Sequence, residues 1–237
     1  MAPRVAEADS AFRRRAFSRA DLLVLIGLLC FLATVLLQVS KVRKQRAGEE
    51  HCRANLKVIN GAVLLYAEDY QKTFPAMAPD RSTGVWWWYK ELVKKYVHGS
   101  VSSIADSLFA CPADRGYADP GPFFRNAKFD YGSYVFNGVN LPGVPNLAGV
   151  QATAVQEPYI TLLMMEWSAH APLSWHRSRT GRKNFPFYQD AENLVGFVDG
   201  HSARVKIYYD GINPAFSRDP IPGYHYRFSA QTSFLAP

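Results

Sequence analysis

Residues 13–39 read RRRAFSRADLLVLIGLLCFLATVLLQV, and the 18 residues from Leu22 to Val39 carry no charge. An α-helix of that length rises about 27 Å, enough to cross the hydrocarbon core of a bilayer. A buried core helix is rarely apolar on every side with cations beyond both ends. A cleaved secretory signal has a shorter apolar run and is followed by an Ala-x-Ala-like site, whereas KVRKQR follows here. The sequence therefore predicts a membrane-spanning helix.

The positive charge of the chain is concentrated around this apolar run. The net charge is +7, and residues 1–46 hold nine Lys or Arg against three Asp or Glu. The other 191 residues are nearly neutral, with 18 basic and 17 acidic side chains, so nucleic acid is excluded as a main partner. The length of 237 residues and the 48% apolar content exclude a disulfide-stapled miniprotein and a wholly disordered chain.

Asp21 stands at the edge of the apolar run, where a carboxylate needs a partner. An unpaired carboxylate costs about 3 kcal/mol at the centre of a membrane helix and less near its end. Positions i and i+4 share one face of a helix, so a free α-amino group four residues earlier would lie beside Asp21.

These residues resemble the processing signal of type IV pilins and type II secretion pseudopilins. The signal consists of a short basic leader, a small residue, Phe, and an acidic residue at the fifth position of a long apolar helix. The resemblance implies cleavage by prepilin peptidase between Ala16 and Phe17, with N-methylation of the new Phe17 amine. It also implies that Asp21 pairs with a Phe17 ammonium, in the family typically that of a neighbouring subunit. The chain departs from the pattern, with Ala16 in place of Gly, Asp21 in place of Glu, and Arg19-Ala20 in place of two apolar residues.

The orientation of the helix follows from the resemblance, because flanking charge does not settle it. Five Arg precede the helix and four Lys or Arg follow it. The expected organisation is a cytoplasmic leader peptide over 1–16, a single-pass inner-membrane helix with its membrane-proximal segment over 17–51, and an exported periplasmic domain over 52–237. The expected partners are prepilin peptidase, other pilin or pseudopilin subunits, and the membrane.

The helical pattern continues beyond the membrane run as one apolar stripe. Its members recur at alternating spacings of four and three: Cys52, Leu56, Ile59, Val63, Tyr66 and Tyr70. Because no Pro occurs between Phe17 and Pro75, one continuous helix of about 80 Å from Phe17 to Tyr70 is expected. A helix-turn-helix hairpin is the alternative.

The remainder of the chain predicts an α+β domain. Residues 85–97 favour a helix, and residues 131–137 and 159–166 favour strands rich in aromatic and branched side chains. Residues 193–209 predict a hairpin in which Asp199-Gly200 forms a two-residue type I′ turn. The predicted fold is pilin-like, a long N-terminal helix packed on a small antiparallel sheet.

Three further patches resemble pseudopilin-like proteins of planctomycete and verrucomicrobial type. They are CRANLKVINGAVLLYAEDYQKTFP over 52–75, CPAD over 111–114, and NLVGFVDG over 193–200. A His often precedes the last motif by a fixed spacing, and Gln189 stands at that position here.

Cys52 and Cys111 form a candidate disulfide, because both fall in the part expected to be exported to an oxidising compartment. A bridge between them would close a loop of about 60 residues and contribute about 4 kcal/mol. Two free buried thiols are the alternative. Cys30 lies inside the membrane run and is most simply a small apolar residue.

The sequence contains none of the common catalytic motifs, so an enzyme is not expected. Glu166, His170 and His176 could form a metal cluster, but they straddle a strand end and a Pro-bearing loop, which favours solvated polar residues. Four acidic residues could bind calcium without EF-hand-like spacing: Asp190, Glu192, Asp210 and Asp219. No cofactor is therefore predicted, and calcium is left open.

The hypothesis favoured by the sequence is a structural subunit of a pseudopilus or type IV pilus-like filament. The alternative is a monomeric membrane-anchored protein whose aromatic-rich domain binds a polysaccharide or another envelope partner. Three consecutive Trp at 86–88 could serve such a ligand, although a core cluster is the commoner role. An anchored hydrolase is least favoured by the absence of motifs.

Overall fold

The computed structural model describes residues 18–76, 88–97, 107–114, 132–138, 144–169, 175–176, 191–208 and 219–231. The chain forms two compact units, Met1–Lys44 and Gln45–Pro237. The described residues contain a long helix and a four-stranded antiparallel sheet, so the α+β class is confirmed.

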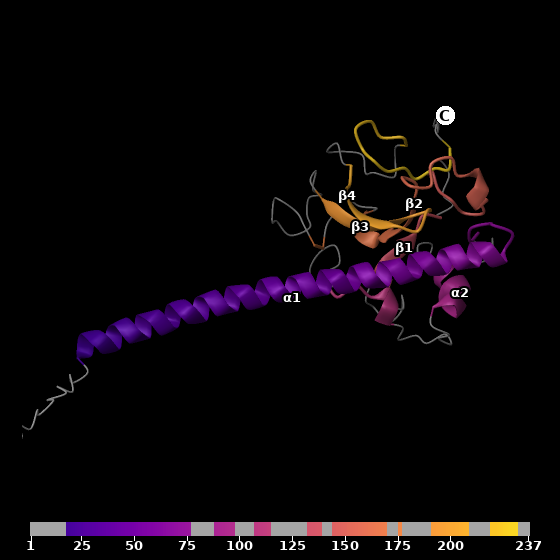
Figure 1. Cartoon of the computed structure of the whole chain (residues 1–237). Coiled ribbons are helices and arrows are strands. Elements are labelled where there is room, and N and C mark those ends of the chain that lie inside the picture. Colours follow the sequence, from indigo (N-terminus) through magenta and orange to yellow (C-terminus); the bar gives the residue numbers. More distant parts are fainter. Residues whose placement is uncertain are drawn as a thin grey trace, which may run out of the picture. The chain divides into compact units, whose positions relative to one another are not determined.

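Helix α1 runs over Arg19–Asp69 as one element of 51 residues (Figure 1). The helix-turn-helix alternative is therefore wrong. α1 ends where Gln71 and Lys72 adopt positive φ values of 54° and 62°, which a continuing α-helix does not allow. The turn leaves Tyr70 beyond the helix and 46% exposed, so the predicted stripe ends one member earlier than expected.

The sheet is an antiparallel meander in the order β1-β2-β3-β4. The strands match the predicted segments closely: β1 covers Tyr134–Phe136, β2 covers Leu162–Glu166, β3 covers Glu192–Phe197 and β4 covers Ser202–Lys206. Central residues are in register across all four strands, with Val135 opposite Met165, Met165 opposite Val195, and Val195 opposite Ala203. All residues of β1 and β2 are buried, because both faces of these strands are covered.

The hairpin between β3 and β4 differs from the predicted type I′ turn. The amide of Phe197 donates to the carbonyl of His201, and the amide of Gly200 donates to the carbonyl of Phe197. The loop therefore contains three residues, and among them Gly200 has a positive φ of 93° whereas Asp199 does not. This is the pattern of a type I turn followed by a left-handed residue, the other common way of using an Asp-Gly pair.

The second half of α1 packs against the sheet within the unit that begins at Gln45. Cys52, Leu56, Ile59 and Val63 are all 0% exposed, as the stripe predicts. The helix lies so close to β3 that a Cβ atom on Gly196 would lie 2.5 Å from the Asn60 side-chain oxygen. This contact explains a glycine in the middle of a buried strand.

The predicted helix over 85–97 is shorter in the part that is described. Helix α2 covers Tyr89–Val93 and continues as the 3-10 turn η1 over Lys94–Tyr96. Trp88 is 6% exposed and makes an edge-on contact with Phe136, with ring centroids 6.1 Å apart. Trp88 is therefore a core residue, and the other two Trp of the cluster lie outside the described residues.

Candidate functional site

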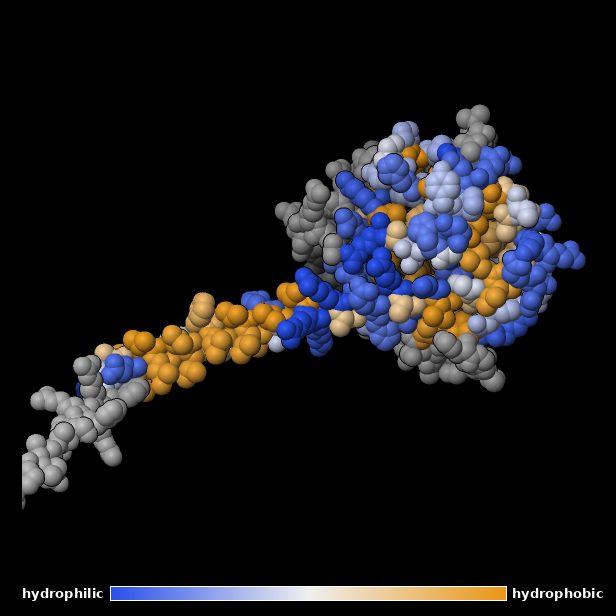
Figure 2. Space-filling model, viewed as in Figure 1, coloured by the Kyte–Doolittle hydropathy of each residue, from blue (hydrophilic) through white to orange (hydrophobic). Residues whose placement is uncertain are grey.

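The first half of α1 has the character of a membrane span. Among the described residues, α1 is the one helix long and apolar enough to cross a bilayer, and the most apolar stretch has no buried residue. Figure 2 shows an almost unbroken hydrophobic surface along this stretch, where Leu23 and Phe31 are each 70% exposed. Apolar side chains exposed on every side of a helix require lipid or other helices around them.

Asp21 makes a local interaction that the sequence analysis missed. The Ser18 amide and hydroxyl both donate to Asp21 Oδ2, at 3.0 and 2.8 Å, and the Asp21 amide donates to Ser18 Oγ at 3.1 Å. These reciprocal bonds form a capping box at the start of α1. The sequence pattern of a capping box, Ser-x-x-Asp, is present directly before the apolar run and could have predicted this interaction. The predicted cleavage residues Ala16 and Phe17 lie outside the described residues, so the charge pair with Phe17 stays a prediction.

A disulfide joins the two predicted cysteines in the unit from Gln45 onward. The Sγ atoms of Cys52 and Cys111 are 2.12 Å apart, and both residues are 0% exposed. Cys52 comes from α1, and Cys111 follows the short 3-10 turn η2, Ser107–Phe109. The Asn55 side chain donates to the carbonyl of Ala110 at 3.1 Å and fixes this segment beside the helix.

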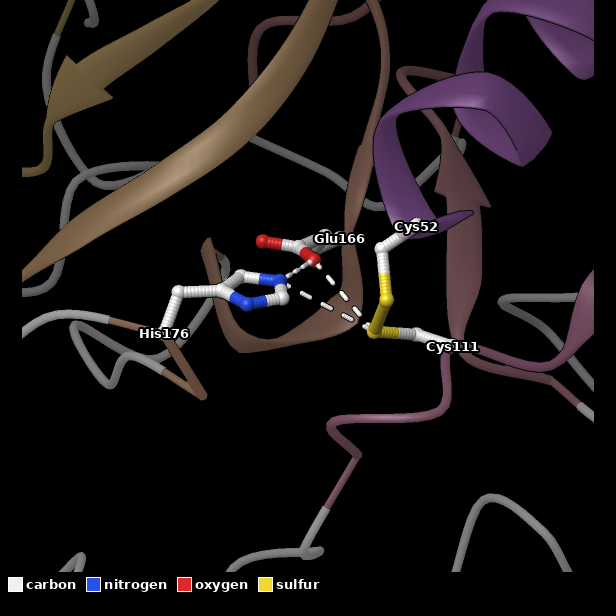
Figure 3. A group of neighbouring side chains, drawn as sticks. All are labelled: Cys52, Cys111, Glu166 and His176. Atoms are coloured by element: carbon white, nitrogen blue, oxygen red, sulfur yellow. Dashed lines mark hydrogen bonds and ion pairs between the residues drawn. A yellow bond between two sulfur atoms is a disulfide. The ribbon is translucent and has the colours of Figure 1, made fainter. Parts of the chain in front are cut away.

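Two ionisable side chains lie directly beside the disulfide (Figure 3). His176 Nε2 lies 2.6 Å from Glu166 Oε1, and these two atoms lie 3.8 and 3.7 Å from Cys111 Sγ. Glu166 is fully buried at the end of β2, and the side chain of His176 is 4% exposed. The second carboxylate oxygen of Glu166 accepts the Leu194 amide at 2.9 Å, so β3 sets the orientation of the carboxylate.

The surroundings of this cluster are apolar, with a few well-paired polar groups. Tyr134 donates its hydroxyl to the carbonyl of Cys52 at 3.1 Å, and Tyr89 donates to the carbonyl of Tyr134 at 3.0 Å. Burial raises the pKa of both phenols well above the ordinary value, and the nearby Glu166 raises the pKa of Tyr134 further. The disulfide and Glu166 thus lie in the buried core, and the side chain of His176 is nearly buried.

The structure brings together part of the metal cluster considered from the sequence. Glu166 and His176 meet, and the expectation that they are solvated is wrong, because their side chains are 0% and 4% exposed. They lie beside Cys52 and Cys111, which were considered as a disulfide or as two free thiols, and His170 lies outside the described residues. The side-chain donor atoms of these four residues all lie within 4.8 Å of one another. No spacing motif in the sequence marks this grouping, because the four residues come from distant segments.

The acidic residues considered for calcium do not form a described site. Asp219 accepts the amides of Phe228 and Ser229, at 3.1 and 2.8 Å, and so orders the C-terminal segment. Glu192 is half-buried at the start of β3. Asp190 and Asp210, like the family-motif position Gln189, lie outside the described residues.

Comparison with known proteins returns no relative. No family model matches the chain, and no curated protein or solved structure is significantly similar to it. Function is therefore inferred from the apolar helix and the buried cluster.

Proposed function

We propose that the protein is a structural subunit of a type II secretion pseudopilus or type IV pilus-like filament. The proposal rests on one observation: the apolar half of α1, in which no residue is buried, follows an acidic residue and leads into a folded unit from Gln45 onward. In this proposal prepilin peptidase cleaves between Ala16 and Phe17, and the processed helix packs against other subunits. The proposed role is packing, with no catalysis.

The proposed location is the inner membrane, with the unit from Gln45 onward in the periplasm. A disulfide between Cys52 and Cys111 suits an oxidising compartment and supports this orientation. Cleavage on the cytoplasmic side would leave a charged Phe17 amine next to Ser18. When helices bundle in lipid, a neighbouring carboxylate is the partner that such an ammonium requires, because an unpaired charge in a low dielectric is costly.

Intact mass spectrometry of the protein extracted from its native membrane tests the processing step. The expected species begins at Phe17 and carries one added methyl group. A chain that retains its first 16 residues would contradict the filament proposal and leave the monomeric anchored protein as the explanation.

Crosslinking tests the assembly step through Asp21. Single cysteines placed along residues 22–39 of a Cys30→Ser chain are expected to give ladders of crosslinked subunits. Asp21→Ala should remove the ladders while leaving processing intact, and Asp21→Glu, which keeps the charge, should preserve them. Wild-type ladders in Asp21→Ala would contradict the charge pair.

Ser18→Ala separates the two interactions of Asp21. The variant removes the hydroxyl from the capping box and keeps the carboxylate. If Asp21 serves assembly by charge, Ser18→Ala forms ladders like the wild type. If Ser18→Ala and Asp21→Ala lose ladders equally, the carboxylate acts as a helix cap and the proposed charge pair is wrong.

A further inference from the structure

The cluster around the Cys52–Cys111 disulfide contains two ionisable groups that a structural crosslink does not require. A disulfide is uncharged and needs neither a carboxylate nor an imidazole beside it. Glu166 is nevertheless 0% exposed, and a carboxylate buried so deeply is costly unless other groups compensate it. Here the Leu194 amide holds one oxygen, while the other oxygen faces His176 and Cys111.

We propose that the reduced form of this cluster binds one zinc ion through Cys52, Cys111, Glu166 and His176. The proposal is independent of filament assembly. Thiolate, imidazole and carboxylate are the ligands that Zn²⁺ takes in proteins, usually four in a tetrahedron. The four residues supply one donor atom each, and all four atoms lie within 4.8 Å of one another.

The distances show how small the required rearrangement is. With bonds of about 2.3 Å to sulfur and about 2.0 Å to nitrogen or oxygen, tetrahedral ligand atoms lie about 3.3–3.8 Å apart. Cys111 Sγ already lies 3.7 Å from Glu166 Oε1 and 3.8 Å from His176 Nε2. The disulfide bond must be reduced, and the Glu166–His176 contact, now 2.6 Å, must open to admit the ion. The widest separation in the group, up to 4.8 Å, must close by about 1 Å to reach tetrahedral spacing.

The orientation of the donors also favours a common ligand. In Figure 3 the imidazole Nε2 and the carboxylate Oε1 both point toward the sulfur of Cys111. The Leu194 amide fixes Glu166 through Oε2, the oxygen that does not contact His176, as groups behind a metal ligand commonly do. Three elements thus hold the donors in place. α1 carries Cys52, β2 carries Glu166, and β3 supplies the Leu194 amide that binds the Glu166 carboxylate.

The chemical steps balance with a phosphine as reductant. The phosphine gives two electrons to the disulfide, the Sγ–Sγ bond breaks, and water supplies two protons to the sulfurs and the oxygen of the phosphine oxide. Zn²⁺ binding then releases one proton from each thiol, because thiolates are the metal ligands. Cys52 and Cys111 are therefore linked in either state, covalently when oxidised and through the metal when reduced.

The test uses the full chain in detergent with Cys30→Ser, so that the thiols of the cluster are the only ones present. After anaerobic reduction by a phosphine, Co²⁺ is added as the probe. One equivalent should produce the thiolate-to-cobalt charge-transfer band and the visible bands of a tetrahedral site, and Zn²⁺ should displace it. The oxidised protein should show neither the charge-transfer band nor the visible bands.

Variants that keep both cysteines identify the other ligands. Glu166→Gln and His176→Gln should each weaken Zn²⁺ affinity at least about tenfold, measured by competition with a chromophoric chelator. His201→Gln is the matched control, because that imidazole also lies 2.6 Å from a carboxylate, that of Asp199, but on the exposed hairpin. The His201→Gln variant should bind Zn²⁺ with the same affinity as the Cys30→Ser chain from which it is made.

Three results would overturn the proposal. The first is a reduced protein without the tetrahedral thiolate bands, and the second is a Zn²⁺ affinity equal to that of the Cys30→Ser chain in both Glu166→Gln and His176→Gln. If reduction unfolds the unit from Gln45 onward, one equivalent of Zn²⁺ must restore its native circular dichroism. A reduced chain that stays unfolded with Zn²⁺ contradicts the site equally.

Discussion

The two halves of α1 share one backbone conformation but have opposite environments. Over residues 22–39 the apolar side chains point in every direction and none is buried. Over residues 52–67 most apolar side chains form one stripe buried against the sheet, and Leu65, on the other face, is 52% exposed. Leu29 is 55% exposed and Leu56 is 0% exposed. The period of the hydropathy pattern, rather than the number of apolar residues, therefore distinguishes a lipid-facing helix from a helix that packs in a protein core.

Polar residues differ between the halves in the same way. In the first half, Ser18 and Asp21 pair with each other at the helix end. In the second half, buried polar residues reach other elements: Asn60 donates to the carbonyl of Phe197 at 3.1 Å, and Glu49 forms an ion pair with Arg204 of β4. Such contacts fix the register of the helix on the sheet, which apolar packing alone specifies less strictly.

The largest expected difference between the halves is the effect of removing a leucine side chain. Leu56→Ala should lower the free energy of unfolding of the unit from Gln45 onward by about 3 kcal/mol, because it leaves a cavity in a fully buried site. Urea unfolding of the full chain in micelles, followed by Trp fluorescence, measures this directly. All five Trp lie beyond residue 85 and report on this unit alone.

Leu29→Ala is the matched control in the same helix. Its side chain is 55% exposed and belongs to the other unit, so the urea midpoint should not move. A shift as large as that of Leu56→Ala would mean that the two units unfold together, and the contrast drawn between the halves would fail.

The same contrast explains how much of the fold the sequence predicts. The helix, its buried stripe and all four strands are visible in patterns of neighbouring residues, because period-3.6 and period-2 hydropathy are local properties. Tyr70 fits the spacing of the stripe but lies beyond the helix end, since Gln71 and Lys72 adopt positive φ values. Asp199-Gly200 correctly marks a turn, although the dipeptide suits both a two-residue and a three-residue loop.

The buried cluster was beyond sequence reasoning for a different reason. Cys52, Cys111, Glu166 and His176 come from four segments that meet only when α1 packs on the sheet. The pairing of the cysteines was proposed from their number and compartment, but nothing local places a carboxylate beside them. Where each residue lies relative to the sheet depends on the fold of the whole chain. The grouping therefore becomes visible only in the structure.

A smaller effect is expected where α1 approaches the sheet most closely. Gly196→Ala should cost about 2 kcal/mol, because the new Cβ would lie 2.5 Å from Asn60 Oδ1 and the helix or strand must shift. The same urea titration measures the loss. In an Asn60→Ala background the substitution should cost markedly less, since the two closest atoms, Asn60 Oδ1 and Cγ, are removed and only the Cβ atom at 3.1 Å remains. An equal cost in both backgrounds would mean that this contact does not set the distance between α1 and β3.

The smallest expected effect is a gain in the free energy of unfolding. It should arise at a glycine inside the second half of α1. Gly61 has no atom within 4 Å of an added Cβ, so Gly61→Ala raises helix propensity without a collision and should stabilise the unit by about 0.8 kcal/mol. Gly27→Ala meets equally open space in the first half and should leave the Trp-monitored midpoint unchanged. A loss of stability in Gly61→Ala would show that another part of the chain covers this face of α1, and the packed side of the helix would then be wider than the stripe.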